Sequence, residues 1–108
     1  MGHLFYGSSE RPVVMPDVVL AHIKVVIATK LRRGESFTLS WQHPRGEEAG
    51  RSTLWIHPSI PLRFVFSSVD PEVLDPAVLQ RYATAANSSS GLVVDLTVTP
   101  VHENASAR

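Results

Sequence analysis

One long apolar run, residues 17–34 with the sequence DVVLAHIKVVIATKLRRG, constrains the fold more than any other part of the chain. Its β-branched residues would also suit a buried strand, but its length and its two ends favour a helix. Asp17 suits an N-cap, because its carboxylate can accept hydrogen bonds from the free amides of the first turn. Gly34 suits the other end, where helices are commonly followed by a left-handed residue. We therefore expect a helix over most of this run.

The side chains of this helix predict one wide apolar face. At about 100° per residue, His22, Thr29 and Arg33 lie opposite that face. The apolar face itself collects Val19, Leu20, Ile23, Val26, Ile27 and Leu31. Further apolar residues fall outside it, which indicates a helix with more than one neighbour: Val18, Val25 and Ala28.

The bulk composition is that of a single small globular domain. The chain has 108 residues, of which 44% are hydrophobic and 19% charged. That length suffices for one core and one site. Lys24 and Lys30 interrupt the longest apolar runs, so no membrane span is expected. No export signal is visible, and a cytoplasmic location is the expectation. The absence of cysteine excludes disulfides, thiolate metal sites and cysteine nucleophiles.

The formal charge is zero, but it is unevenly distributed. Residues 24–63 carry seven lysines and arginines against three glutamates, whereas residues 64–108 carry two arginines against five acidic residues. A basic segment fits an anionic partner such as nucleic acid, and it also fits ordinary solvation and a helix C-terminus. The candidates for contact with an anionic partner are Arg32, Arg33, Arg45 and Arg51.

Two short strands are expected at the N-terminus. Residues 3–7 and 11–15 flank Gly7-Ser8-Ser9-Glu10, whose composition suits a tight turn, so the two should form a hairpin. Pro12 cannot donate a backbone hydrogen bond. The second strand should therefore lie at a sheet edge or begin after the proline.

The middle of the chain predicts a second hairpin. Residues 36–43 alternate between apolar and polar side chains, and residues 51–57 supply an antiparallel partner across an exposed loop. A register that keeps Leu54 on the apolar face of this hairpin places Trp55 on the outer face. After a bend with two prolines, residues 62–66 are expected to complete a three-stranded meander.

The last third of the chain predicts a helix and a strand. Asp75 and Pro76 form an N-cap followed by a proline at the first helical position, which indicates a helix to about residue 87. Residues 92–98 alternate as a final strand, and residues 100–108 are expected to form a disordered tail. The apolar stripe of the second helix is thin and consists of Leu79, Tyr82, Ala83 and Ala86.

These elements predict an α+β fold in one domain of residues 1–99. Their order is ββα-βββ-αβ, which we interpret as a two-layer arrangement of an antiparallel sheet with two helices covering it.

Several short motifs carry a resemblance to a known family. They include the opening Gly2-His3-Leu4-Phe5-Tyr6-Gly7, the string Leu31-Arg32-Arg33-Gly34-Glu35-Ser36-Phe37 and the string His57-Pro58-Ser59-Ile60-Pro61-Leu62. In these motifs the chain resembles a family of small actinobacterial proteins, of about a hundred residues, whose function is unknown and which are often labelled as ATP-dependent DNA ligases. The resemblance implies a name but no catalytic residues.

The residues themselves do not predict ligase chemistry or another recognisable enzyme. Nucleotidyl transfer needs a lysine nucleophile in a Lys-x-Asp-Gly setting, whereas Lys24 is followed by Val25-Val26 and Lys30 by Leu31-Arg32. The five histidines lack the spacing of a metal site, and neither a phosphate loop nor a nucleophile elbow occurs. We therefore expect no catalytic residues, no metal and no cofactor.

One group of residues suits ligand binding. Alternation places it on the sheet face that points away from the first helix, where an indole ring among polar and cationic groups could stack a base or a sugar. A tryptophan is also often covered by a second helix or a subunit contact. The candidate ligand-binding residues are Trp55, His57, Arg63, Gln42 and Ser40.

The expected function is that of a small non-catalytic binding or interaction module, with a weak nucleic-acid contact or a protein as candidate partner. The alternative is an enzyme or a ligase-accessory protein whose site is assembled across a homodimer. Self-association as a dimer is expected because Trp55, Val65 and the apolar flank of the first helix exceed what a small monomer needs to expose.

Overall fold

Six strands and two helices form within residues 1–97, which are the residues described by the computed structural model of the chain. The α+β class expected from the sequence is confirmed, and the elements follow one another in the expected order. In chain order they are β1 (Gly2–Tyr6), β2 (Val13–Met15), α1 (Asp17–Arg32), β3 (Phe37–Gln42), β4 (Arg51–Ile56), β5 (Leu62–Val65), α2 (Pro76–Ala86) and β6 (Leu92–Val94).

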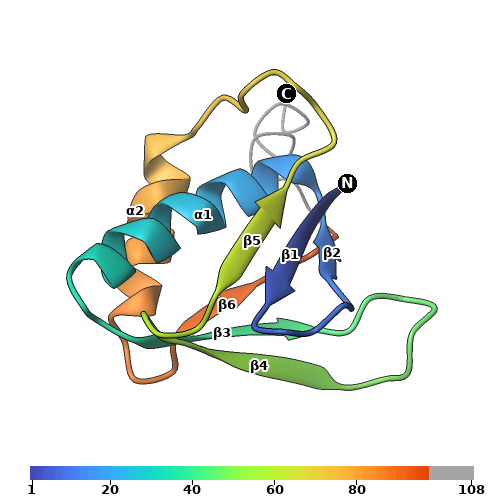
Figure 1. Cartoon of the computed structure of the whole chain (residues 1–108), viewed down its shortest axis with the longest axis horizontal. Coiled ribbons are helices and arrows are strands. Elements are labelled where there is room, and N and C mark those ends of the chain that lie inside the picture. Colours follow the sequence, from blue (N-terminus) through green and yellow to red (C-terminus); the bar gives the residue numbers. More distant parts are fainter. Residues whose placement is uncertain (98–108) are drawn as a thin grey trace.

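The strands form two three-stranded sheets (Figure 1). Sheet A has the order β2-β1-β5, and sheet B has the order β4-β3-β6. The N-terminal hairpin is confirmed, because β1 pairs antiparallel with β2. As Pro12 predicts, β2 lies at an edge and begins at Val13. The hairpin of β3 and β4 also has the expected register, in which Thr38 lies opposite Trp55 and Leu39 opposite Leu54.

The expected meander of β3, β4 and β5 is wrong. β5 leaves β4 and pairs antiparallel with β1, so that Leu62 lies opposite Tyr6 and Val65 opposite His3. The bend between the strands contains two prolines, and its turn is closed by a hydrogen bond of 3.0 Å from the Ile60 amide to the His57 carbonyl. The Gly7 amide then donates to the Pro61 carbonyl at 2.8 Å, which fixes the chain against sheet A.

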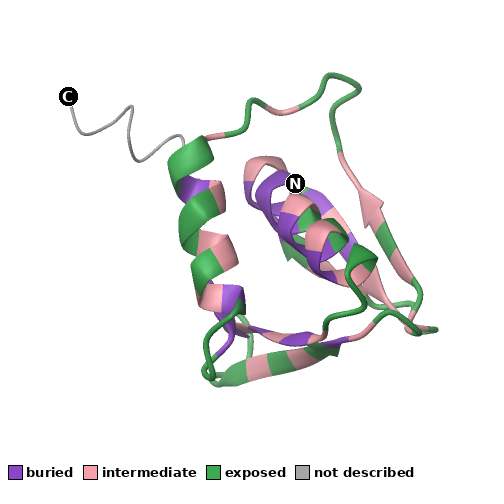
Figure 2. Ribbon diagram, turned by 90° about the vertical axis from the view of Figure 1, so that its left-hand side faces the viewer, coloured by how far each residue is buried: buried purple, intermediate pink, exposed green. Residues whose placement is uncertain are grey.

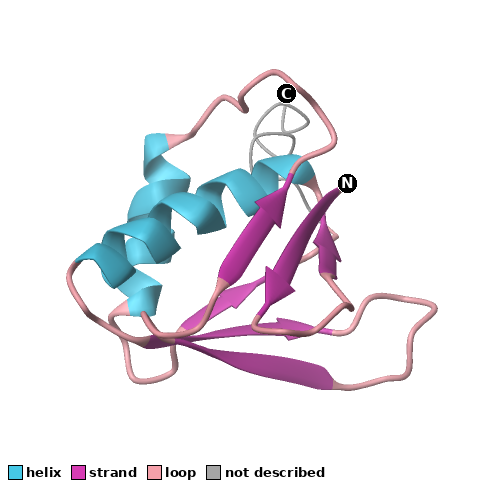
Figure 3. Ribbon diagram, viewed as in Figure 1, coloured by secondary structure: helices cyan, strands magenta, loops and turns pink. Residues whose placement is uncertain are grey.

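The direction of β6 also differs from the expected antiparallel sheet. β6 pairs parallel with β3, with Ser40 opposite Val93. A parallel neighbour needs a crossover connection, and α2 supplies it by returning the chain to the end of sheet B where β3 begins (Figure 3). β6 ends at Val94. The expected extension of this strand is wrong at residues 95–97, where the chain leaves the sheet in a turn. Residue 98 and the expected disordered tail of residues 100–108 lie outside the described residues.

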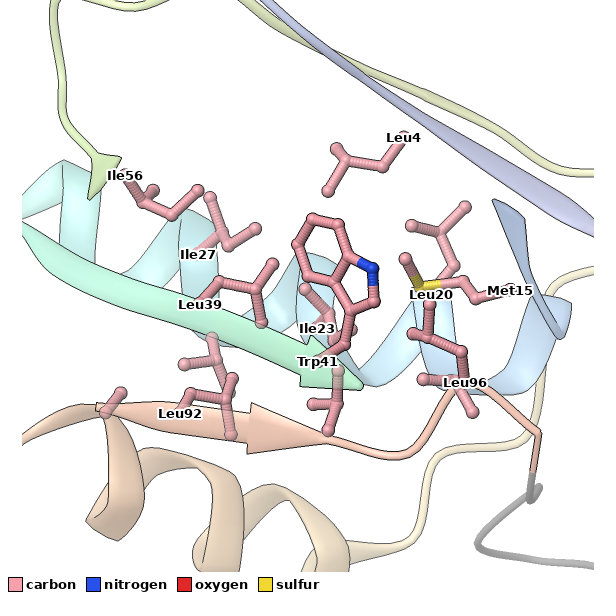
Figure 4. Close-up of a cluster of buried hydrophobic side chains, with 14 of the residues drawn as sticks. Leu4, Met15, Leu20, Ile23, Ile27, Leu39, Trp41, Ile56, Leu92 and Leu96 are labelled. Carbon is pink, nitrogen blue, oxygen red and sulfur yellow. The ribbon is translucent and has the colours of Figure 1, made fainter. Parts of the chain in front are cut away.

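The core lies where both sheets meet α1 (Figure 2). Leu20, Ile23 and Ile27 of α1 are at most 2% exposed. They share one cluster with Leu4 of sheet A and with Trp41 of β3 (Figure 4). Sheet A and sheet B therefore cover the same helix from different directions.

His22 is buried, contrary to its expected place opposite the apolar face. Its side chain is fully inaccessible, and its ring lies edge-on to Tyr82 of α2. Nδ1 donates to the Val18 carbonyl at 2.6 Å, and Nε2 accepts from the Asp75 amide at 2.9 Å. Because both ring nitrogens have partners, the imidazole can be buried there, and it ties α1 to the start of α2.

The two ends of α1 differ in how well the sequence predicts them. Asp17 is the first helical residue and does not cap the helix with its side chain, which corrects the expected N-cap. At the other end, Gly34 has φ +71° as expected. Its amide donates to the Leu31 carbonyl and the Glu35 amide to the Lys30 carbonyl, both at 3.0 Å, which is a Schellman arrangement.

The Asp17 carboxylate instead joins three separate segments. Its Oδ2 accepts from the Ser67 hydroxyl at 2.6 Å and from the Ser67 amide at 3.0 Å, and its Oδ1 lies 3.9 Å from the N-terminal ammonium of Met1. These groups attract the carboxylate away from the first turn of α1. Asp17 thus fastens the chain after β5 to the start of α1.

α2 begins as predicted. The Asp75 carboxylate accepts from the Ala77 amide at 2.9 Å, and Pro76 is the first helical residue. The side chain that α2 buries most deeply is Val78, at 1% exposure, which the expected stripe omits. Ala86 is buried as expected.

Gly91 permits the parallel pairing of β6 with β3, and this can be tested. Its φ is +74°, and a Cβ there would lie 1.9 Å from Thr38 Oγ1 and 2.7 Å from the Thr38 carbonyl oxygen. We expect Gly91→Ala to lower the free energy of unfolding by about 2–5 kcal/mol, since it combines backbone strain with overpacking. Gly34→Ala is the matched control, because φ is +71° and nothing lies within 4 Å. It should cost only about 1–2 kcal/mol. Urea denaturation measures both free energies of unfolding. Equal losses in the two variants would contradict the close approach of Gly91 to Thr38.

Asp17 predicts a specific pH dependence of stability. Burial raises its pKa, but the hydrogen bonds from Ser67 and the N-terminal ammonium outweigh burial and hold the pKa below 3.8. Asp17 therefore stabilises the fold above the unfolded pKa, and this contribution is lost as the pH falls through the folded pKa. Asp17→Asn should lower the free energy of unfolding by about 1–2 kcal/mol at neutral pH, and the difference from wild type should shrink below about pH 4. Ser67→Ala should show the same narrowing, and a difference that stays constant with pH would contradict this assignment.

Candidate functional site

The face of sheet B that points away from α1 is open. Its inner face buries Phe37, Leu39 and Trp41, and both helices lie on that inner side (Figure 3). The strand register places alternate residues on the opposite side, which we call the outer face. It consists of Thr38, Ser40 and Gln42 from β3, Arg51, Thr53 and Trp55 from β4, and Val93 from β6.

Trp55 is the largest side chain on the outer face. It is 53% exposed, which confirms its expected orientation, whereas Trp41 is only 8% exposed. The Tyr6 hydroxyl of β1 donates to the Trp55 backbone carbonyl. This bond holds the edge of β4 at Trp55, so the indole is presented from a fixed backbone.

Polar groups occupy the middle of the outer face. Ser40 Oγ and Thr53 Oγ1 lie 2.8 Å apart across the two strands. The next pair along is Gln42 and Arg51, both exposed. None of the seven residues that form the outer face is acidic, and within residues 1–97 Arg51 forms no ion pair.

The outer face continues into two shallow hollows near the end of β3. The first, of about 610 Å³, includes Arg51, Thr53 and Val93 in its lining, and the second, of about 430 Å³, includes His43 and Arg45. Gln42 and Val93 line both hollows, so the two adjoin each other at these residues. A ligand on the sheet can therefore extend toward Arg45.

Asp95 also lines the second hollow. Its carboxylate accepts from the Thr97 hydroxyl at 2.6 Å and from the Thr97 amide at 2.9 Å. These two hydrogen bonds lower the pKa of Asp95, although partial burial opposes them. The second hollow thus contains a negative charge as well as Arg45, which limits the extent of the positive surface.

Three of the five predicted ligand-binding residues share the outer face: Ser40, Gln42 and Trp55. His57 follows β4, and its Nδ1 accepts from the Ser59 amide at 3.1 Å, so its ring serves the turn. Arg63 lies on β5 in sheet A, with its guanidinium carbon 5.1 Å from the centroid of the Phe5 ring. Arg63 is separated from the group because β5 pairs with β1 and not with β4.

The four candidate arginines form two pairs at opposite ends of β3. Arg32 and Arg33 end α1 just before β3 begins, whereas Arg45 and Arg51 flank the loop that follows β3. A strand of six residues separates the pairs by roughly 20 Å. They do not form one patch, and only Arg51 and Arg45 adjoin the outer face.

The histidines of the described residues serve local structure. His43, for example, donates from Nδ1 to the Glu48 carbonyl at 2.9 Å and lies 2.7 Å from the Ser52 hydroxyl through Nε2. Within residues 1–97, no group of three or more histidine or acidic side chains is placed to hold a metal ion. In the same range, neither helix is long and apolar enough to cross a membrane.

Alternation of the β3–β4 hairpin was sufficient to place Ser40, Gln42 and Trp55 on the outer face, but it did not predict Val93. Val93 reaches this face only through the parallel pairing of β6 with β3, which has no local sequence signal. Arg51 was recognised by its charge and not as a neighbour of Gln42.

The fold and the outer face define a small α+β module with one uncovered sheet face that combines an exposed indole, hydroxyls and an arginine. The chain belongs to the family described as a domain of unknown function, DUF7882, whose model matches residues 1–97. Comparisons with curated proteins and with solved structures each found no significant match.

The two tryptophans give a direct test of the outer face. In a Trp41→Phe variant, the remaining Trp55 should be quenched strongly by acrylamide, whereas in Trp55→Phe the buried Trp41 should be protected. Trp55→Ala should change the free energy of unfolding by about 1 kcal/mol or less, and Trp41→Ala should cost about 3–5 kcal/mol. Similar quenching of both residues would show that Trp55 is covered.

Proposed function

We propose that this protein is a non-catalytic binding module that holds single-stranded nucleic acid on the outer face of sheet B. The observation that supports the proposal most is Trp55, half exposed on a sheet face without acidic residues and on the same strand as Arg51. An exposed indole can stack a base of any sequence, and an arginine nearby can contact a phosphate.

The spacing favours a strand over a single nucleotide. Trp55 and Arg51 are four residues apart on β4, or about 13 Å. At a spacing of about 3.4 Å per nucleotide along a stacked strand, about four nucleotides span this distance, so a strand can use both groups at once. Ser40 and Thr53 lie between them, Gln42 lies opposite Arg51, and all three can hydrogen-bond to base edges.

A single strand fits the outer face better than a duplex. Stacking on Trp55 requires an unstacked base, and bases of a duplex are already stacked on one another. Only Arg51 and Arg45 adjoin this face, so few phosphates are neutralised and the binding is weak. With two such contacts, the logarithm of the affinity should fall against the logarithm of salt concentration with a slope of about −1.4.

The resemblance to small proteins labelled as DNA ligases agrees with an accessory role beside nucleic acid in the cytoplasm. It carries less weight than the geometry, because a label is an association and not a mechanism.

Fluorescence anisotropy with a labelled single-stranded oligonucleotide and the matching duplex tests the proposal. Trp55→Ala should weaken binding by about 5- to 150-fold through lost stacking and leave the salt slope unchanged. Arg51→Ala should make the salt slope shallower by about 0.7 through one lost phosphate contact.

Arg81→Ala is the matched control, because Arg81 is an exposed arginine on α2, which lies on the side of sheet B opposite the outer face. It should leave both the affinity and the slope unchanged. The proposal fails if the oligonucleotide does not bind below about 100 μM at low salt, since non-specific binding usually reaches that range. It also fails if Trp55→Ala binds as well as the wild type.

A further inference from the structure

Exposed apolar side chains gather on the segment between β5 and α2. This segment, residues 66–75, arches away from the body of the molecule (Figure 1). Val69 is 99% exposed, Val73 is 78% exposed and Leu74 is 40% exposed. Val69 gains almost nothing from the fold of a single chain, and exposed apolar residues clustered in this way mark an interaction surface.

The segment forms one side of an apolar groove along α1. A hollow of about 320 Å³ lies between them, and its apolar lining includes Ala21 and Val25 of α1 with Phe66 and Val69 of the segment. A second hollow of about 290 Å³ lies between α1 and α2 and also includes Val25. Together they form what we call the α1 groove, whose centre is Val25.

The two ends of the α1 groove carry opposite charges. Asp70 and Glu72 line the first hollow, together with Lys24. Arg33 lines the second hollow, which has no acidic residue in its lining. Lys30 also lines that hollow, but its ammonium is already bound to Asn87 Oδ1 at 2.6 Å and to Glu35 at 3.1 Å. Within residues 1–97, no ion pair involves Asp70, Glu72 or Arg33.

A groove with an apolar centre and opposite charges at its ends is self-complementary. A two-fold axis through Val25 that sets α1 antiparallel to its copy brings the acidic end of one groove onto the basic end of the other. The same rotation carries Val69 toward the neighbourhood of Thr29 in the second hollow. We propose that the α1 groove is the interface at which two copies of this chain form an isologous dimer.

A second copy fits the groove better than other occupants. An anionic membrane surface would be repelled by Asp70 and Glu72 beside the exposed valines. A partner segment of one charge sign would be repelled at one end of the groove, because like charges face each other there. Only an occupant with the reverse charge order suits both ends, and an antiparallel copy has that order.

The dimer would leave the outer face of sheet B free. α1 packs on the inner face of sheet B, so the outer faces of both copies remain uncovered when the α1 grooves meet. Two weak faces linked in one particle bind a longer strand more tightly than either face alone. The interface does not depend on the function proposed for the outer face.

Light scattering and sedimentation of the full chain test the interface. The wild type should show a mass that rises with concentration from 11.9 kDa toward twice that value. Val69→Asp should weaken dimerisation by about tenfold or more. It should leave the melting temperature unchanged at concentrations where the chain is monomeric, because Val69 is 99% exposed in the monomer. Arg81→Glu is the control and should dimerise as the wild type does.

A charge swap distinguishes this interface from any other. Arg33→Glu and Asp70→Arg should each weaken dimerisation, because each places like charges together at the two symmetric ends. The double variant restores opposite charges and should recover dimerisation. Circular dichroism on each variant shows whether the monomer is folded. A mass that stays near 11.9 kDa up to about 1 mM would overturn the proposal. A dimer that is unaffected by Val69→Asp, or a double variant that does not recover, would overturn it as well.

Discussion

Burial of α1 from three directions is the interaction on which the other elements depend. Within residues 1–97 each sheet has three strands, so each needs a partner to cover its apolar face. Sheet A covers α1 through Leu4, and sheet B covers it through Leu39 and Trp41. Each fully buried aliphatic side chain at this contact contributes about 1.5–3 kcal/mol relative to an exposed one. Two sheets that share one helix gain a single core that neither could form alone.

The third side of α1 shows how a polar residue enters that core. α2 covers His22, and a buried imidazole is tolerated there because the Val18 carbonyl and the Asp75 amide use both ring nitrogens. These two hydrogen bonds also hold the N-cap of α2 against α1, so that the crossover to β6 starts from a fixed point. The flank of α1 around Val25 has neither a sheet nor a fully packed helix over it. It is therefore the place where this helix can accept another molecule.

Local sequence patterns predicted the strands and the helix ends better than they predicted which strands pair with one another. Alternation in residues 36–43 and 51–57 was sufficient for the register of β3 with β4 and for the exposure of Trp55. Gly34 and Asp75 predicted helix ends correctly, because caps depend on neighbouring residues only. The partner of β5 and the direction of β6 depend on contacts between distant segments, which periodicity does not encode. For the same reason, the prediction that Arg63 belongs to the candidate site is wrong. The burial of His22 was not predicted either, because it depends on where α2 packs against α1.

The contact between Tyr6 and Trp55 determines how the outer face can be used. β4 is the edge strand of sheet B, and an exposed edge can recruit another strand through its free backbone groups. At Trp55 the backbone carbonyl already accepts the hydroxyl of Tyr6, so strand addition there would compete with a bond that joins the two sheets. The indole above that carbonyl remains accessible. Recognition at this end of sheet B therefore favours side chains over backbone, which suits stacking on a flat ligand and not extension of the sheet.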